Sequence, residues 1–441
     1  MIRQFIVIAA LLFGTVIPAH GDGTHPQGIQ LDGTLGSAGK LSLPGPDYDI
    51  KAEYGKQAGA NLFHSFQQFN IHSGESAIFS GPDSVQNIIS RVTGGSASWI
   101  DGKLGSDIPN ADMYFLNPAG VMFGPDASLD LGGSFHVSTA DYLRMGENDR
   151  FYAMPHANEV MSVAAPAAFG FLDNDNAPII VEGRGEITAQ EFGDTSAGLH
   201  VREGRTVSLI GGNIEIKKGT HYIRQKTDGD DNPVFRQERD AWTYPIYETE
   251  KDEHGNLIND EYGRPVYKLD ENGSPIPVYM LDENGSRIPV METVRSGAVT
   301  APGGQINIAS AASADEVETG PQASGSKFQV SEGGKITVSG KSLIDVSGTG
   351  AGSIFIRGGQ LIARDANIQA RTLEDRDGGM TDIQADTVSL ADGARIIGNT
   401  QGTGKGSDIV IRAGDPCFRI REPVRPSHRG RYEQHHGIYR G

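Results

Sequence analysis

The sequence holds a single cysteine, Cys417, and two tryptophans among 441 residues. One cysteine cannot form a disulfide within the chain, so stability has to come from packing and hydrogen bonds. After residue 17, no apolar stretch approaches the roughly 20 residues that a membrane-spanning helix needs. The net charge of −18 argues against nucleic acid or an anionic membrane as the partner, because phosphate binding requires a basic surface.

Catalytic and metal-binding motifs are also missing. The sequence has no His-Glu-x-x-His pair and no paired cysteines at zinc spacing, and we expect no cofactor and no metal site. The Asp/Asn runs at 173–176 and 228–232 could offer oxygen ligands to calcium, but each lacks the bidentate Glu of a full loop. Solvated Asx turns are the default interpretation of both runs.

The first 21 residues read as a secretory signal peptide. A short cationic head, Met1–Gln4, precedes the apolar core Phe5–Ile17, which is too short to span a bilayer. Pro18–Gly21 supplies a small-x-small cleavage site. We therefore expect the chain to enter the Sec export machinery and the mature protein to be secreted.

Glycine is abundant, with 59 residues, and it recurs directly before short alternating strands. These units begin at Gly212, Gly304, Gly334, Gly352 and Gly406. Alternation places Ile and Val on one face, and irregular recurrence of one strand-turn unit indicates a solenoid. We predict an all-β fold, a right-handed parallel β-helix with about 20–25 residues per coil. A β-sandwich is the alternative, and it would need long antiparallel hairpins throughout.

Such hairpins are expected in one region, residues 220–296, which interrupts the glycine rhythm. Leu-Asp-Glu-Asn-Gly-Ser occurs at 269–274 and again at 281–286. Asn-Gly between short apolar runs is a strong hairpin signal. We predict a hairpin-rich acidic insertion, or a flexible acidic loop if it does not order. A tolerated surface insertion explains it better than receptor contact does.

The stretch 61–139 is the one around which the chain is organised. It contains Asn61-Leu62-Phe63-His64-Ser65-Phe66, then an Arg-Val-Thr-Gly-Gly run at 91–95, then Asn117-Pro118-Ala119-Gly120. Asn at the first position, Pro at the second and Gly at the fourth predict a type I turn for the last of these. The lone His64 among aromatic neighbours is more often packed than catalytic. Residues 22–60 are expected to cap the first rung of the stack.

These residues resemble the amino-terminal secretion domain of filamentous haemagglutinin-like exoproteins of bacterial two-partner secretion. The family pairs an asparagine-led motif with a later Asn-Pro-Asn-Gly turn, and Ala119 stands where the family often has Asn. The resemblance implies an adhesin-like exoprotein that a dedicated outer-membrane transporter with periplasmic domains recognises. A receptor on a host or neighbouring cell is a further partner that it suggests. It implies transporter-recognition motifs made of Asn61, Leu62, Phe63, His64, Ser65, Phe66, Asn117, Pro118, Ala119 and Gly120.

Together these observations divide the chain into five parts. They are a signal peptide (1–21), a secretion domain (22–219), the insertion (220–296), a β-helix continuation (297–414) and a basic irregular tail (415–441). The abrupt change of composition after Gly414 is typical of a truncated member of a family of longer proteins. A non-enzymatic role is expected. The alternative is a secreted β-helix enzyme that degrades polysaccharide, since that fold includes such enzymes.

Overall fold

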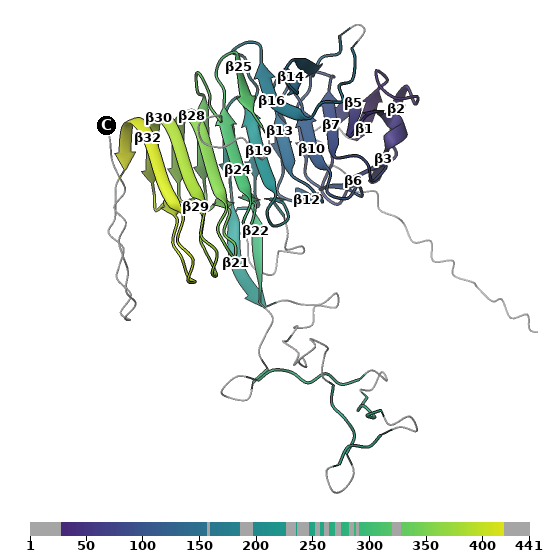
Figure 1. Ribbon diagram of the computed structural model, residues 1–441, viewed down its shortest axis with the longest axis vertical. Coiled ribbons are helices and arrows are strands. Elements are labelled where there is room, and N and C mark those ends of the chain that lie inside the picture. Colours follow the sequence, from purple (N-terminus) through teal and green to yellow (C-terminus); the bar gives the residue numbers. More distant parts are fainter. Residues whose placement is uncertain are drawn as a thin grey trace, which may run out of the picture. The chain divides into compact units, whose positions relative to one another are not determined.

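The chain winds into a β-helix with three faces (Figure 1). The computed structural model describes residues 28–156, 159–185, 197–225, 291–319 and 328–418, together with short pieces between 235 and 287. Consecutive coils place their strands side by side in parallel register, so that each strand pairs with its equivalents in the coils before and after it. The predicted parallel β-helix is therefore confirmed.

The first face is the longest parallel ladder. Its strands, in order along the stack, are β5 (Asn61–Phe69), β7 (Asn87–Val92), β10 (Asp112–Leu116), β13 (Phe135–Ser138), β19 (Thr206–Gly211), β24 (Gln305–Ser310), β28 (Ser353–Arg364), β30 (Met380–Ala391) and β32 (Asp408–Phe418). The last three strands are long enough to continue onto the second face, as the pairing of β28 with both β24 and β26 shows.

The second and third faces complete each coil. The second face is formed by β8 (Ser98–Ile100), β11 (Val121–Phe123), β17 (Ile179–Glu182), β20 (Ile214–Lys217) and β26 (Lys335–Ser339). The third face is formed by β3 (Asp47–Lys51), β6 (Ser76–Ser80), β9 (Lys103–Ser106), β12 (Ser128–Asp130), β18 (Leu199–His200), β23 (Ala298–Thr300), β27 (Leu343–Asp345), β29 (Asn367–Gln369) and β31 (Arg395–Ile397). A parallel bridge between Ser128 and Gly198 joins its two halves.

Coil length varies more than the sequence indicates. Where no insertion intervenes, paired residues of neighbouring coils lie from 22 positions apart, as in Met113 and Phe135, to 29 apart, as in Asp47 and Ser76. The strands pair in register in every coil, and the turns between them differ in length. All five strands expected after glycine are present, namely β20, β24, β26, β28 and β32.

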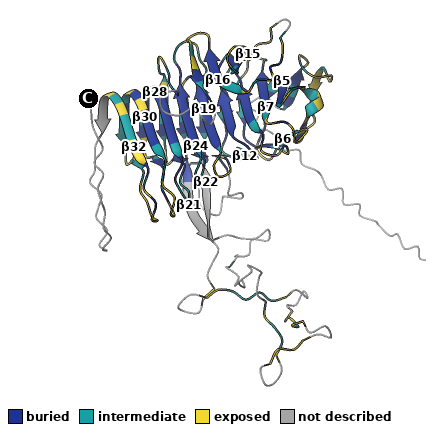
Figure 2. Ribbon diagram, in the orientation of Figure 1, coloured by how far each residue is buried: buried dark blue, intermediate teal, exposed yellow. Residues whose placement is uncertain are grey.

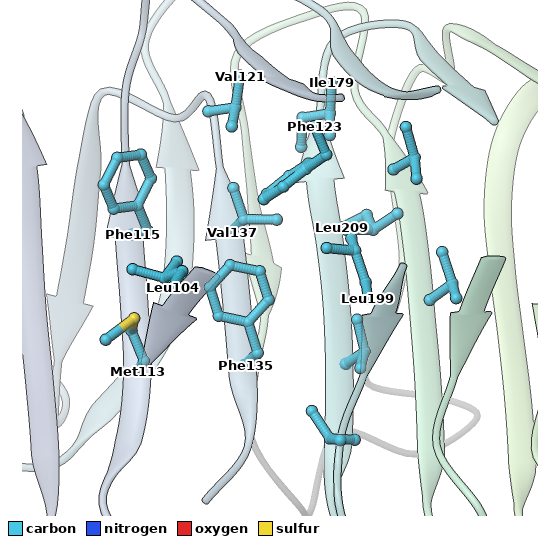
Figure 3. Packing of buried hydrophobic residues seen from close by; sticks show 14 of the residues in the cluster. Leu104, Met113, Phe115, Val121, Phe123, Phe135, Val137, Ile179, Leu199 and Leu209 are labelled. Carbon is cyan, nitrogen blue, oxygen red and sulfur yellow. The ribbon is translucent and has the colours of Figure 1, made fainter. Parts of the chain in front are cut away.

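An inner core runs along the stack between the three faces. Figure 3 shows part of it, with Phe115 and Phe135 from the first face, Phe123 from the second and Leu104 from the third. All four are fully withdrawn from solvent. Figure 2 shows the first-face strands buried along most of the stack and partly exposed at β32. Burial of this apolar surface is the main source of stability in a chain without disulfides.

Antiparallel strands cover the first rung. β1 (Ile29–Asp32) pairs with the distal half of β5, and β4 (Lys56–Ala58) pairs with its beginning. β2 (Lys40–Ser42) extends β1, and the 3-10 turn η1 (Ala52–Tyr54) leads into β4. The exposed N–H and C=O groups of β5 are thus satisfied, which confirms the predicted amino-terminal cap.

A second antiparallel sheet covers the outside of the first face. It consists of β15 (Asp149–Tyr152), β14 (Tyr142–Met145), β16 (Pro166–Phe171) and β25 (Asp315–Glu318), in that order. We call it the lateral sheet. Between it and the first face lies an outer core that includes Phe63, Tyr114 and Phe169. The sequence analysis expected antiparallel hairpins only in 220–296, and that expectation was wrong.

The described residues between 221 and 295 belong to a compact unit separate from the stack. At its base β21 (Thr220–Gln225) pairs with β22 (Met291–Ser296). Within it, antiparallel bridges join Leu269 to Pro275 and Leu281 to Arg287. These bridges bracket the two Asp-Glu-Asn-Gly repeats, whose own turn residues lie outside the described part of the chain. Hairpin pairing is thus present on both sides of the repeats.

At the other end of the stack, β32 runs to Phe418, four residues past the expected start of the tail at 415. The tail from 419 and the signal peptide lie outside the described residues. Among the residues that are described, no helix is long and apolar enough to cross a membrane.

Candidate functional site

The first motif forms the beginning of β5, and its side chains alternate between the two cores. Leu62 and Phe66 belong to the inner core, whereas Phe63 belongs to the outer core and lies 4.9 Å from the ring of Phe151 in the lateral sheet. Strand alternation produces this division, because successive side chains face opposite sides of a sheet. Every residue from Asn61 to Phe66 is buried, so the motif itself presents no side chain to solvent.

Asn61 uses its amide to hold a segment far away in the sequence. Its Nδ2 donates to the carbonyl oxygens of Ser162, at 2.9 Å, and Ala164, at 2.7 Å. Its Oδ1 accepts a hydrogen bond of 2.8 Å from Nδ2 of Asn87, the paired residue in the next coil. A side chain with both an amide donor and an acceptor is required to fill these positions.

His64 is packed inside the stack, as the sequence analysis favoured. Its Nε2 lies 3.2 Å from the carbonyl oxygen of Lys51, and its ring lies 5.2 Å from that of Phe79. Its Nδ1 is buried and has no hydrogen-bond partner. Burial lowers the pKa of His64 to about 4, which keeps the ring neutral at physiological pH.

Ser65 joins the cap to the second coil. Its Oγ donates to Asp32 at 2.6 Å and accepts from Nε of Arg91 at 2.8 Å. Burial raises the pKa of Asp32, but hydrogen bonds from Ser65, Thr34 and Thr93 outweigh it, so the pKa lies below the usual value. The carboxylate therefore stays ionised beside the buried arginine.

Arg91 is the residue that sequence reasoning passed over. It is 1% exposed, forms a 2.7 Å ion pair with Glu159 and donates to the carbonyl oxygen of Tyr152 in the lateral sheet. It also lies over the ring of Phe151, 4.6 Å from the centroid. The available signal was the single charged residue of the strand 87–92, since a buried charge needs a partner.

The second motif forms the predicted turn between β10 and β11. The N–H of Gly120 donates to the carbonyl oxygen of Asn117 at 3.0 Å, which closes a four-residue turn. Within the turn only Gly120 has a positive φ, of 115°, and this excludes a type II turn, which needs one at Ala119. Pro118 and Ala119 are half-exposed at its tip.

Asn117 fixes this turn to its neighbours. Its Nδ2 donates to the carbonyl oxygen of Ser96 and to Oγ of Ser98, both at 3.0 Å, in the preceding coil. Its Oδ1 accepts from the N–H of Ala119 at 3.0 Å, and its own N–H donates to Ser138 in the following coil. One residue thus aligns the same corner of three successive coils.

The structure does not bring the two motifs together. Asn61 pairs with Asn87, which pairs in turn with Asp112, the first residue of β10. Asn117 follows the last residue of that same strand. The two asparagines therefore lie at opposite ends of the first face and two coils apart. They cannot form a single side-chain site, and each instead shapes its own corner of the stack.

The described residues around both motifs hold no metal-binding cluster. Over the described residues, no three His, Cys, Asp or Glu side chains gather as a metal site would require. In the acidic run at 173–176, Oδ1 of Asp173 accepts from the N–H of Asp175 at 2.9 Å, which is the expected Asx turn. The run at 228–232 lies outside the described residues. The arrangement around both motifs supports folding and presentation of a surface.

The amino-terminal half of the chain is similar to a known protein family. The family model for the TPS (two-partner secretion) secretion domain matches residues 27–235. The heme/hemopexin-binding protein of Haemophilus influenzae is 25% identical over 167 residues. These are 37% of this chain and 16% of that protein, so the chain spans about a sixth of the length of this relative.

Two solved structures are also similar. The secretion domain of filamentous hemagglutinin is 13% identical, with a TM-score of 0.33, covering 87% of this chain and all of the other. The HMW1 secretion domain from Haemophilus influenzae is 17% identical, with a TM-score of 0.24, covering 89% of this chain and 97% of the other.

Proposed function

We propose that the protein is an adhesin-like exoprotein exported through a dedicated outer-membrane transporter, because the family model for the two-partner secretion domain matches residues 27–235. The family match carries this proposal. A domain of this family implies a cognate transporter, and the first coils of the stack are the part that the transporter would meet. The proposed destination is the cell surface or the medium of a Gram-negative bacterium.

The route before the outer membrane belongs to the same proposal. Residues 1–21 have the composition of a signal peptide that would direct the chain to the Sec machinery and so into the periplasm. The transporter's periplasmic domains would then recognise the region around Asn61 and Asn117. A receptor on a host or neighbouring cell is the proposed target of the exported protein.

Folding of the stack supplies a physical direction for export. In a solenoid each coil contacts only its neighbours, so folding can begin on the first coils and propagate. Each emerging coil would bury Ile and Val against the coil before it, as Ile308 and Ile356 do between β24 and β28. This burial would oppose sliding back into the transporter.

The export proposal is tested with the full chain in the bacterium that produces it. Disruption of the cognate transporter gene should remove the protein from the surface and the medium and leave it in the periplasm. Asn61→Ala and Asn117→Ala should each lower export, and Ala119→Asn, which restores the common family residue at a half-exposed position, is the matched control. Equal amounts outside the cell with and without the transporter would refute the proposal.

A polysaccharide-degrading enzyme is not favoured, because the family model that matches residues 27–235 describes a secretion domain. A non-enzymatic role is part of the proposal. Incubation of the purified protein with plant and bacterial polysaccharides should release no reducing or unsaturated sugar, and release of either would restore the enzyme alternative.

A further inference from the structure

The segment 159–164, which leads from β15 toward β16, buries Met161 in the outer core and yet holds two valines in solvent. Its polar side chains are turned inward, with Glu159 9% exposed and Ser162 8% exposed. Two of its apolar side chains face solvent, with Val160 82% exposed and Val163 74% exposed. We call residues 159–164 the clamped segment.

Buried polar contacts hold the clamped segment at three points. Arg91 pairs with Glu159 at 2.7 Å, and Oγ of Ser162 donates to Asp149 at 2.6 Å. Asn61 donates to the carbonyl oxygens of Ser162 and Ala164. Contacts on both sides of Val163 mean that its exposure is a fixed feature of the fold. Truncating either Asn61 or Arg91 would release the segment.

The surroundings leave the two valines uncovered. The residue against Val163 is Gly59, where an added Cβ would lie 3.4 Å from Cβ of the valine, so no side chain shields it there. Met154, 57% exposed, precedes the segment and adds further apolar surface. Residues 160–164 carry no charge. Val160 and Val163 are thus held in solvent three residues apart on one segment, and exposed apolar surface of this kind marks interaction sites on soluble proteins.

We propose that Val160 and Val163 are the contact through which a periplasmic domain of the cognate transporter recognises this chain. This inference rests on the proposed function, because the clamped segment lies within the matched secretion domain. Asn61 is then a positioning residue, which acts by holding the valines outward and does not touch the transporter. The uncharged segment fits an apolar surface on the transporter domain.

The first test replaces both valines in the full chain, as Val160→Ser with Val163→Ser, in the producing bacterium. The amount outside the cell should fall about tenfold or more, because two buried apolar side chains are lost from the contact. The unfolding midpoint should not change, since both side chains are exposed. Leu373→Ser, at an exposed leucine on a later coil, is the matched control and should be exported normally.

The second test places a photo-reactive residue at position 163 or, as control, at position 373, again in the full chain. Irradiation during export should link position 163, and not 373, to the outer-membrane transporter. Normal export of the serine variant, or an adduct only with a second copy of this chain, would overturn the inference. Export of wild-type protein without the transporter would instead overturn the proposed function, so the two failures are distinct.

Discussion

Arg91 and Glu159 form an ion pair, 2.7 Å long, that is almost completely withdrawn from water. The arginine comes from the second coil, and the glutamate comes from the segment after the lateral sheet's edge strand β15. Arg91 also donates from Nε to Oγ of Ser65, from Nη1 to the carbonyl oxygen of Tyr152 and from Nη2 to Oγ1 of Thr34. The pair therefore holds the lateral sheet against the first rungs of the stack.

Replacing the arginine tests this role. Arg91→Met leaves a buried carboxylate without its partner, and we expect a loss of about 3–5 kcal/mol in the free energy of unfolding. Denaturant titration of the purified protein measures it. Arg144→Met is the matched control, because Arg144 and Glu316 pair at 3.0 Å while partly exposed. That change should cost no more than about 1 kcal/mol. Equal losses for both would contradict the assignment.

Acid should destabilise the fold through two buried histidines, His64 and His136. Burial lowers the pKa of His64 to about 4 and that of His136 to about 3 from the ordinary 6.5, so below 6.5 the unfolded chain binds protons that the folded chain does not. The stability that these groups contribute should be complete above pH 6.5, and His64 alone should account for a loss of about 2–3 kcal/mol as the pH drops toward 4. Asp32 adds to the loss only below its ordinary pKa of 3.8.

Because His136 contributes to the slope of stability between pH 7 and 4.5 as well, the His64 contribution is the difference in slope between a His64 variant and wild type. His64→Leu should flatten the slope relative to wild type, whatever its effect on stability at pH 7. His156 is exposed, and His156→Leu serves as the matched control that should keep the wild-type slope. An unchanged slope in the His64 variant would show that the ring does not resist protonation in the folded state.

The turn at Asn117 should depend on its side chain. Asn117→Ala removes the hydrogen bonds to Ser96, Ser98 and Ala119 and leaves buried groups unpaired. We expect a cost of about 1–3 kcal/mol in thermal or denaturant unfolding. Ala119→Asn, at the half-exposed tip of the same turn, should stay within about 0.5 kcal/mol. If Asn117→Ala left the free energy of unfolding unchanged, backbone hydrogen bonds alone would hold the turn at 117–120.

The stack should close without its insertion. An added Cβ at Gly297 would lie 2.9 Å from the carbonyl oxygen of Lys217, so the ends of β20 and β23 already approach each other. Deleting residues 219–296 and joining Lys218 to Gly297 should change stability by no more than about 1 kcal/mol, because loop length enters the closure entropy only logarithmically. Circular dichroism and the unfolding midpoint would check this. Loss of the strand signal would show that the insertion is needed for folding.

The stacked strands were predictable because their signal is local. A glycine followed by alternating Ile or Val, as at Gly304 and Gly334, indicates both where the turn lies and which side chains face inward. The structure has a strand directly after each of these glycines. The lateral sheet was missed although Gly146 between two short runs offered a hairpin signal. The outer face of the first ladder is buried too, and its apolar residues obscure the alternation.

The role of Asn61 was beyond what sequence alone could predict. Its hydrogen-bond partner Ser162 lies 101 residues away, and periodicity carries no information at that separation. The sequence could indicate that an asparagine-led motif opens a strand. It could not indicate that the side chain turns inward to hold a carbonyl group of a distant segment.

The cap over β5 restricts how two copies can associate. β1 and β4 pair with the edge of β5, so a strand from another copy cannot add directly to the part of β5 that they cover. The strand edges left at this end belong to β2, on the outside of the cap, and to β3, the first strand of the third face. Head-to-head association of two copies through the covered part of β5 is therefore blocked.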